Sequence, residues 1–469
     1  MVLSAILEFN KLNNPLNVEQ VVGQIATAIK KAGGRALMVG GCVRDAMMGI
    51  TPKDIDIEVF GIEAQHLERI VGENFEYDSC GVSFGVLKLK HIDIDISLPR
   101  RESKIGLGHR AFNIASDPFM SVEEASLRRD FTINSMYKDP LTGEIIDPNG
   151  GKNDLEQKIL RHVSHKFSED PLRVLRGAQF VARFDLEAHD TTIDICRAIT
   201  PESLAAERIF EEWKKLILKG VKISKGLQFL QATNWVKYFP ELNALIGCKQ
   251  EPKWHPEGDV WEHTKCCLDF YAKNRIGEQY EDLVVGMAVL CHDFGKPSCT
   301  FFDEKVGRLR SLGHDEKGVG PTYSFLSRMT NEEKFISDVV PLVKNHMRPF
   351  SMWRSDARDG AVRRLSCQVK RIDRLIRVCL ADDGGRPPFP SDTSSLDWLA
   401  AQAKRLDVQD KAPKPILMGR DLLSLGLKAG PLFKKILDEA YDNQIEGVFS
   451  DLDGAKKWLK EKLLTLENC

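Results

Sequence analysis

The pattern of apolar and polar residues changes once along the chain, near Gly150 and Gly151. Before this point short β-rich runs, punctuated by glycines, alternate with helical stretches, and we expect strands at 36–40, 54–60, 84–90 and 92–98. Apolar residues at spacings of three and four predict a helix at 18–32. After Gly151 helix-like stretches dominate, as at 170–184, 201–219 and 282–291. The sequence therefore predicts an α+β protein with an α/β head and a nearly all-helical remainder.

The 469 residues leave room for about three or four domains. Glycine- and proline-containing segments near 150–151, 247–255 and 384–390 are candidate boundaries. We expect a head at 1–150, a helical region at 151–247, a third domain at 248–384 and a helical tail at 385–469.

Charge and cysteine usage narrow the class of protein. Lys and Arg number 66 against 68 Asp and Glu, a net charge of −2, so any phosphate-binding surface must be local. The 11 cysteines are scattered without a CxxC pair, which is typical of reduced thiols in a cytoplasmic protein. The longest apolar run, 283–291, is half a membrane span, so we expect a soluble protein and no membrane partner.

Two alternating runs carry the first candidate site. In Asp54-Ile55-Asp56-Ile57 the aspartates are two apart, so on a strand both lie on one face while the isoleucines face the core. Asp93-Ile94-Asp95-Ile96 repeats the pattern. Carboxylates gathered on one sheet face suit one or two Mg²⁺ ions that hold a triphosphate. The upstream Gly40-Gly41 turn brings backbone N–H groups to phosphate; the alternative is a strand with a solvated acidic face.

These motifs, in order, resemble the class II tRNA nucleotidyltransferase and bacterial poly(A) polymerase superfamily. Gly40-Gly41-x-Val43-Arg44-Asp45 and Asp54-x-Asp56 match its first signature. Further matches are the run Arg128 to Asn134, Asp147-Pro148-x-Gly150-Gly151, Glu169-Asp170-Pro171-Leu172-Arg173 with Arg176, and Glu207-Arg208-Ile209. One departure is Ser135, where the family usually has Ala. The five motifs cover roughly residues 35–220.

The resemblance implies the roles of individual residues. Asp54, Asp56 and Asp95 are expected to be catalytic, the first two as Mg²⁺ ligands. The expected nucleotide-binding residues are Gly40, Gly41, Arg44, Arg128, Arg129, Asp130, Asn134, Asp170, Arg173 and Arg176. The polar segment 103–110 takes the place of the loop that the family links to switching from C to A addition, which favours full CCA addition.

Asp170 and Arg173 have a physical interpretation as a base-selecting pair. They are three apart on a predicted helix, so both project from one face. A carboxylate only accepts and a guanidinium only donates hydrogen bonds, which fits the exocyclic amine and ring acceptor of cytosine and adenine but not guanine or uracil. The alternative is an isolated helix salt bridge.

Histidines and aspartates in the third domain form a second candidate site. The set consists of His263, His292, Asp293, His314, His346 and Asp382. Imidazoles with adjacent carboxylates suit a divalent metal with an open coordination position. The set resembles the HD phosphohydrolase superfamily, which implies metal-dependent phosphatase or cyclic-phosphodiesterase activity; an inactive, structural HD fold is the alternative.

The sequence therefore predicts a bacterial-type CCA-adding enzyme that transfers CMP, CMP and AMP from CTP and ATP to a tRNA 3′ end. It would act with Mg²⁺ in the head and a second divalent metal in the HD domain, as a monomer or homodimer. The alternatives are a poly(A) polymerase or a CC- or A-only enzyme of the same superfamily. An alternative of another class is an HD phosphohydrolase with a non-catalytic, RNA-binding head.

Overall fold

The structure is a computed structural model that describes residues 17–78, 86–104, 112–202, 204–389, 391–424, 427 and 429–467. The chain divides into two compact units, Met1–Ala205 and Ala206–Cys469. This boundary lies inside the predicted helical region 151–247. The finer division into four parts stays a prediction.

The first unit is built on a seven-stranded mixed sheet in the order β3-β4-β5-β2-β1-β8-β9. Its central strands are β1 (Arg35–Val39), β2 (Ile55–Phe60) and β5 (Ile94–Ser97), of which β2 and β5 run parallel. The others are β3 (Tyr77–Asp78), β4 (Val86–Leu89), β8 (Tyr137–Lys138) and β9 (Ile145–Ile146). The predicted strands are thus confirmed within the described residues.

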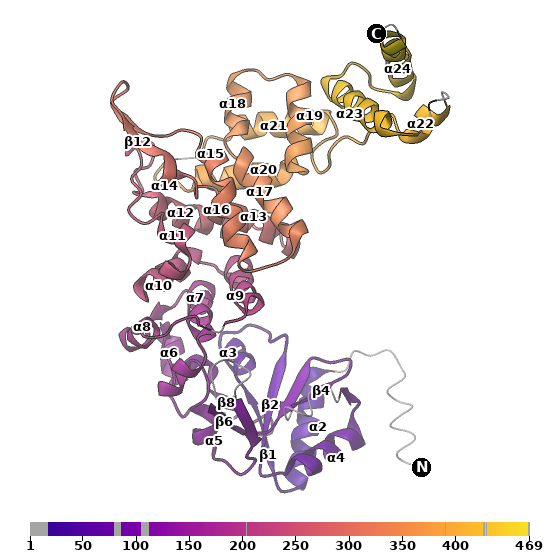
Figure 1. Ribbon diagram of the computed structural model, residues 1–469. Coiled ribbons are helices and arrows are strands. Elements are labelled where there is room, and N and C mark those ends of the chain that lie inside the picture. The colour runs from indigo at the N-terminus through magenta and orange to yellow at the C-terminus, as the bar shows by residue number, and fades with distance from the viewer. Residues whose placement is uncertain are drawn as a thin grey trace. The chain divides into compact units, whose positions relative to one another are not determined.

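Helices α2 (Val18–Lys31) and α4 (Ala64–Asn74) pack side by side against the sheet (Figure 1). Their apolar residues share one core with Ile57 and Ile96 of the central strands. Asn17 caps α2 by accepting a hydrogen bond from the Glu19 N–H, and the helix ends before Gly33 as predicted. The core fixes one face of the sheet, so the aspartates that alternate with these isoleucines lie on the other face.

The rest of the first unit connects and extends this sheet. Its helices are α3 (Gly41–Met47), α5 (Val122–Ser126), α6 (Gly151–Glu156), α7 (Leu172–Phe184) and α8 (Asp190–Arg197). Strands β6 (Arg100–Lys104) and β7 (Phe112–Ser116) pair antiparallel, and most of the polar segment 103–110 lies outside the described residues. Two short strands, β10 (Ile159–Leu160) and β11 (Glu187–Ala188), pair in parallel beyond the predicted end of the strands.

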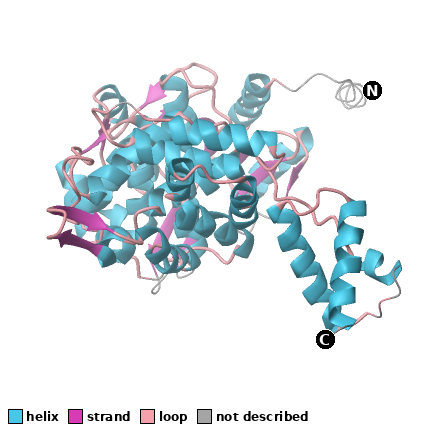
Figure 2. Ribbon diagram, turned by 90° about the horizontal axis from the view of Figure 1, so that it is seen from above, coloured by secondary structure: helices cyan, strands magenta, loops and turns pink. Residues whose placement is uncertain are grey.

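The second unit is mostly helical (Figure 2). Helix α13 (Gln279–Cys291) is buried from Glu281 onward and packs against α9 (Ala206–Lys219), α12 (Val260–Lys273), α17 (Glu333–Asn345) and α20 (Ile372–Gly384). The apolar run 283–291 is therefore the centre of a globular core. None of the described helices is long and apolar enough to cross a membrane.

Shorter elements complete this unit. They are α10 (Ile223–Ala232), α11 (Pro240–Asn243), α14 (Lys296–Cys299), β12 (Thr300–Asp303), β13 (Arg308–Ser311), α15 (His314–Lys317), α16 (Val319–Ser327), α18 (Arg348–Arg354), α19 (Asp359–Val369) and α21 (Ser394–Arg405). The β12–β13 hairpin is an exception to the predicted helical remainder. Helices α22 (Gly419–Ser424), α23 (Pro431–Glu446) and α24 (Leu452–Glu467) pack around a small core of their own.

Candidate active sites

The strand register brings two of the predicted catalytic carboxylates side by side, with the third directly before the strand. Asp56 of β2 pairs directly with Asp95 of β5, and Asp54 lies just before β2. Ile55 and Ile57 alternate with them and are buried on the opposite face. Asp56 and Asp95 thus lie side by side on this face, and Asp54 is near enough for its charge to act on Asp56.

The Gly40 turn lies against these carboxylates. Gly40 has a φ of 78° directly before α3, a conformation that strains any residue with a Cβ. A Cβ added there would lie 3.6 Å from Arg129 Nη1 and 3.9 Å from Asp56 Oδ2. Loss of surrounding water and the negative charges of Asp95 and Asp54 raise the pKa of Asp56, against the opposing effect of Arg129. The carboxylate group therefore fits a divalent cation, which would relieve this repulsion.

A buried carboxylate that the sequence analysis missed, Glu58, holds both predicted phosphate-binding arginines. Arg128 Nη2 donates to Glu58 Oε1 at 2.5 Å, and Arg129 Nη2 donates to Oε2 at 3.2 Å. The Tyr137 hydroxyl donates to Oε2 at 3.0 Å. Burial alone would raise the pKa of Glu58, but the two arginines and this hydrogen bond lower it. Its place two residues after Asp56 on the same strand was the signal available in the sequence.

Four predicted nucleotide-binding residues form one chain of polar contacts. Arg176 Nε donates to Asp130 Oδ2 at 2.8 Å, and Asn134 Nδ2 donates to Asp130 Oδ1 at 3.1 Å. Arg44, which is buried, donates to Asn134 Oδ1 and stacks its guanidinium on Phe184 at 4.4 Å. These contacts join α3 and α7 to the segment between them, so the four residues are structural supports whatever else they bind.

Asp170 precedes helix α7 instead of lying on it, which corrects the predicted helix start. Its backbone is extended and its Oδ1 accepts from the Leu172 N–H at 3.1 Å, which caps the helix. Arg173 lies in the first turn and donates from Nη1 to the Lys166 carbonyl at 2.8 Å and from Nη2 to the Arg128 carbonyl at 2.6 Å. Two backbone carbonyls thus hold the guanidinium beside the arginines that Glu58 binds.

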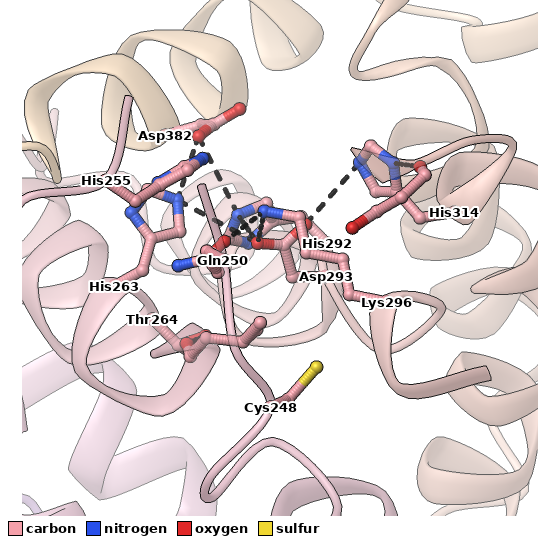
Figure 3. A network of polar contacts seen from close by, with 12 residues as sticks. Cys248, Gln250, His255, His263, Thr264, His292, Asp293, Lys296, His314 and Asp382 are labelled. Carbon is pink, nitrogen blue, oxygen red and sulfur yellow. Dashed lines mark hydrogen bonds and ion pairs between the residues drawn. The ribbon is translucent and has the colours of Figure 1, made fainter. Parts of the chain in front are cut away.

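The histidines and aspartates of the second unit converge as predicted (Figure 3). His263 comes from α12, His292 and Asp293 from the end of α13, and Asp382 from α20. His314 begins α15 and His346 ends α17. We call these six residues the HD cluster. Five segments far apart in the sequence therefore supply one buried group.

Distances within the HD cluster are those between ligands of a shared ion. His263 Nε2 lies 3.0 Å from Asp382 Oδ1, and His292 Nε2 lies 3.3 Å from Asp293 Oδ2. His314 Nε2 lies 3.1 Å from His346 Nε2 and 3.5 Å from Asp293 Oδ1. Metal–nitrogen bonds of about 2.1 Å place neighbouring ligand atoms about 3.0–3.4 Å apart. Asp293 lies between the His263–His292–Asp382 group and the His314–His346 pair, with one carboxylate oxygen near each.

The protonation of these histidines also fits metal binding. Carbonyl oxygens only accept, so Nδ1 must donate in His292, to Val289 at 2.7 Å, and in His346, to Val343 at 2.6 Å. Each Nε2 lone pair then faces the cluster, as second-shell hydrogen bonds arrange it in metal sites. Burial and the neighbouring His314 and His292 lower the pKa of His346 to about 4, so it is neutral at pH 7. Among the described residues, buried His292 Nε2 and Asp293 Oδ1 have no hydrogen-bond partner.

Residues that the sequence analysis did not single out support the HD cluster. Glu257 Oε1 lies 2.7 Å from His263 Nδ1 and 2.9 Å from His255 Nδ1, so His255 joins the cluster indirectly. Lys296 Nζ lies 2.6 Å from Asp293 Oδ2 and donates to Gln250 Oε1 at 2.6 Å. A Cβ at Gly295 would lie 2.0 Å from the His314 carbonyl oxygen, so only glycine lets these segments approach. Lys296 could have been found from its spacing of three after Asp293.

Helices α19 and α20 and the turn between them carry a row of basic residues. The six at helical spacings all form ion pairs: Arg363 with Asp359, Arg364 with Glu446, Lys370 with Asp338, Arg371 with Asp373, Arg374 with Glu281, and Arg377 with Asp282. Arg374 is itself buried. Most of these ion pairs join neighbouring helices, among them α13, α17, α20 and α23.

Comparison with known proteins places the head in a defined class. Residues 36–161 match the family model of the poly A polymerase head domain. Together with the sheet, the Gly40 turn and the three carboxylates, this match defines a nucleotidyltransferase. A multifunctional CCA protein of Xylella fastidiosa is 33% identical over 75% of this chain and 84% of its own length. One from Xanthomonas oryzae is 32% identical over 86% of this chain and 96% of its own. The chain belongs to the class II CCA-adding enzyme family.

Solved structures agree with this fold over nearly the whole chain. The CCA-adding enzyme of Bacillus stearothermophilus in complex with CTP has a TM-score of 0.65 at 22% identity and covers 98% of this chain and 100% of its own. The Thermotoga maritima CCA-adding enzyme complexed with tRNA has a TM-score of 0.55 at 19% identity, covering 98% of each chain. At these identities the likeness is one of fold.

Proposed function

We propose that this protein adds CMP, CMP and AMP from CTP and ATP to the 3′ end of tRNA, through Asp54, Asp56 and Asp95. The observation that carries the proposal is the direct pairing of Asp56 with Asp95 beside the Gly40 turn. The curated relatives named as CCA proteins support the same activity.

In the proposed reaction, the 3′-hydroxyl oxygen of the tRNA forms a bond to the α-phosphorus of the nucleotide. The bond from that phosphorus to the bridging oxygen of the β-phosphate breaks, pyrophosphate leaves, and the hydroxyl proton passes to water. Mg²⁺ bound by Asp54 and Asp56 would neutralise the phosphate charge and orient the reacting oxygens. The Gly40 and Gly41 backbone and the Arg128–Arg129 pair would position the triphosphate.

The direct test supplies tRNA lacking its CCA end with each nucleotide singly and in combination, and sequences the products. Ordered C, C and A addition supports the proposal. A tail of A residues added without CTP would identify a poly(A) polymerase, and only C or only A products would identify a restricted enzyme.

We further propose that Asp170 and Arg173 select the base. Asp170 would accept from the exocyclic amine of C or A, while Arg173, held by two carbonyls, would donate to the ring acceptor. A mismatched contact costs about 1–3 kcal/mol, or about tenfold to a hundredfold in selectivity. Asp170→Ala should lower kcat/KM for CTP and ATP together and narrow their advantage over UTP and GTP. Unchanged selectivity would show that Asp170 serves only to cap α7.

The HD cluster favours a second activity. Its histidine nitrogens and carboxylate oxygens converge, and among them the buried His292 Nε2 and Asp293 Oδ1 have no hydrogen-bond partner among the described residues. We propose that it holds one or two divalent metal ions and hydrolyses phosphate esters such as a 2′,3′-cyclic phosphate. A water oxygen would form a bond to phosphorus, the bond to one ribose oxygen would break, and a water proton would pass to that oxygen.

The test of this second activity uses a double variant. His292→Ala with Asp293→Ala should abolish metal-stimulated hydrolysis of 2′,3′-cyclic AMP and leave CCA addition intact. If the unmodified protein hydrolyses nothing with Mg²⁺, Mn²⁺, Ni²⁺ or Co²⁺, the HD cluster is structural.

A further inference from the structure

The β12–β13 hairpin presents large aromatic side chains to solvent. Phe301 is 46% exposed and Phe302 is 59% exposed, while Trp254, in the loop before α12, is 50% exposed. The hairpin projects from the edge of the second unit in both views (Figures 1 and 2). Exposed rings gathered on one element mark a binding surface more often than solitary exposed residues do.

Both ends of this hairpin lead directly to the HD cluster. Strand β12 begins four residues after Lys296, whose Nζ lies 2.6 Å from Asp293 Oδ2. Strand β13 ends at Ser311, whose carbonyl accepts a hydrogen bond from His314 Nδ1 at 2.8 Å. The base of the hairpin therefore adjoins the HD cluster, and an RNA that follows the hairpin toward its base would reach the ligands of this cluster.

The loop that carries Trp254 is attached to strand β13 by a hydrogen bond. The Leu309 N–H donates to Glu251 Oε2 at 3.1 Å, and the Trp254 N–H donates to the Glu251 carbonyl at 3.0 Å. Lys253 Nζ lies 5.4 Å from the centroid of the Trp254 ring. The loop thus adds a third aromatic ring and a cation to the hairpin surface.

One face of the hairpin combines a ring with two guanidinium groups. The register pairs Phe301 with Arg310 and Asp303 with Arg308, and alternation along the strands puts these four on one face. Asp303 neutralises Arg310 at 3.0 Å, whereas Arg308 is exposed and has no acidic partner among the described residues. Rings that stack on bases beside cations that meet phosphates are the means by which proteins bind single-stranded nucleic acid.

We infer that the hairpin and the Trp254 loop bind the single-stranded 3′ end of an RNA and present its terminal phosphate to the HD cluster. This inference rests on the proposed hydrolase function of that cluster. The core of a protein–protein interface is depleted of charged residues, whereas here Asp303, Arg308 and Arg310 share one face with Phe301. The surface therefore favours RNA over a second copy of the chain.

The first experiment compares a long and a short substrate. Phe301 and Phe302 lie on opposite faces of the hairpin, so Phe301→Ala with Phe302→Ala removes the ring from whichever face the RNA follows. This double variant should lower kcat/KM about tenfold or more for a five-nucleotide RNA ending in a 2′,3′-cyclic phosphate, because base stacking on the ring is lost. Hydrolysis of 2′,3′-cyclic AMP should stay unchanged, because the mononucleotide does not reach the hairpin. Tyr323→Ala, which removes an exposed ring from α16, is the matched control and should alter neither rate. Unchanged activity on the RNA, or an equal loss on both substrates, would overturn the inference.

A binding measurement keeps the inference separate from the proposed hydrolase activity. If wild-type protein hydrolyses neither substrate, the proposed activity fails, and fluorescence anisotropy with the same labelled RNA still tests the hairpin. The double variant should bind about tenfold more weakly, and Arg308→Ala should reduce the slope of log affinity against log salt by about 0.7. Equal affinities would overturn the inference. Unchanged RNA affinity with a loss of self-association in sedimentation would show that the hairpin binds a second copy.

Discussion

The head and the HD cluster both gather carboxylates for a cation, but they differ in burial. Asp54 and Asp56 are exposed on the sheet face, whereas His263 and Asp293 are almost fully buried. Water and salt partly screen the exposed carboxylates and Arg129 offsets the charge of Asp56, so the head can fold around them without an ion. The buried groups must be balanced by protons, Lys296 or metal. The folding of the two units should therefore depend differently on metal and on charge.

The largest expected effect concerns the buried charges of the head, Glu58 with Arg128 and Arg129. Glu58→Gln keeps the shape of the side chain but leaves two arginines without their shared carboxylate, which costs about 3–5 kcal/mol of stability. Calorimetry should show a lower melting temperature for the first unit.

The control is Glu124→Gln, which removes an exposed partner of Arg101 and should barely move the melting temperature. If the first unit melts at the same temperature in both variants, the ion pairs of Glu58 with Arg128 and Arg129 do not stabilise the head.

A second prediction separates the units by their response to metal. Mn²⁺ at a hundredfold excess over its dissociation constant should stabilise the second unit by about 2.7 kcal/mol, because the ion binds only the folded cluster. The His292→Ala, Asp293→Ala double variant should lose this shift in calorimetry, and Asp54→Ala should keep it. A shift of the same size in the double variant would place the ion elsewhere.

A smaller effect should appear in how the stability of the first unit depends on pH. Although burial opposes it, Arg176 and Asn134 hold the pKa of Asp130 below its ordinary value. The unfolded state then binds more protons, so the stabilisation is complete above about pH 4 and disappears as pH falls through the lower, folded pKa. Melting temperatures of wild type and Asp130→Asn should therefore differ at pH 7 and converge below pH 4. A difference independent of pH would exclude this role.

Local patterns predicted much of the fold and of the sites. Strict alternation correctly predicted that Asp56 and Asp95 lie on the face opposite the buried isoleucines, because the period of a strand is two whatever surrounds it. Alternation could not show that Glu58 is covered, since Arg128 and Arg129 reach it from 70 residues away.

The structure differs from the sequence-based expectation at two further places, one for a local reason and one for a non-local reason. The predicted helix start at Asp170 was wrong because a residue before proline avoids helical backbone, and Pro171 follows. The basic residues of α19 and α20 recur at helical spacings, but several of their acidic partners come from other helices, such as Glu281 of α13. Periodicity identifies a helix face and not what packs against it.

The most direct test of the central claim, that the exposed carboxylates of the head perform nucleotidyl transfer, is CMP and AMP incorporation into tRNA by Asp56→Asn. Glu63→Gln, an exposed carboxylate beyond the other end of β2, is the control, and Asp293→Asn reports on the HD cluster. We expect Asp56→Asn to lose about a thousandfold or more of this activity at unchanged tRNA affinity, and the other two variants to add nucleotides at near-wild-type rates. Near-wild-type addition by Asp56→Asn would exclude these carboxylates as the site of nucleotidyl transfer.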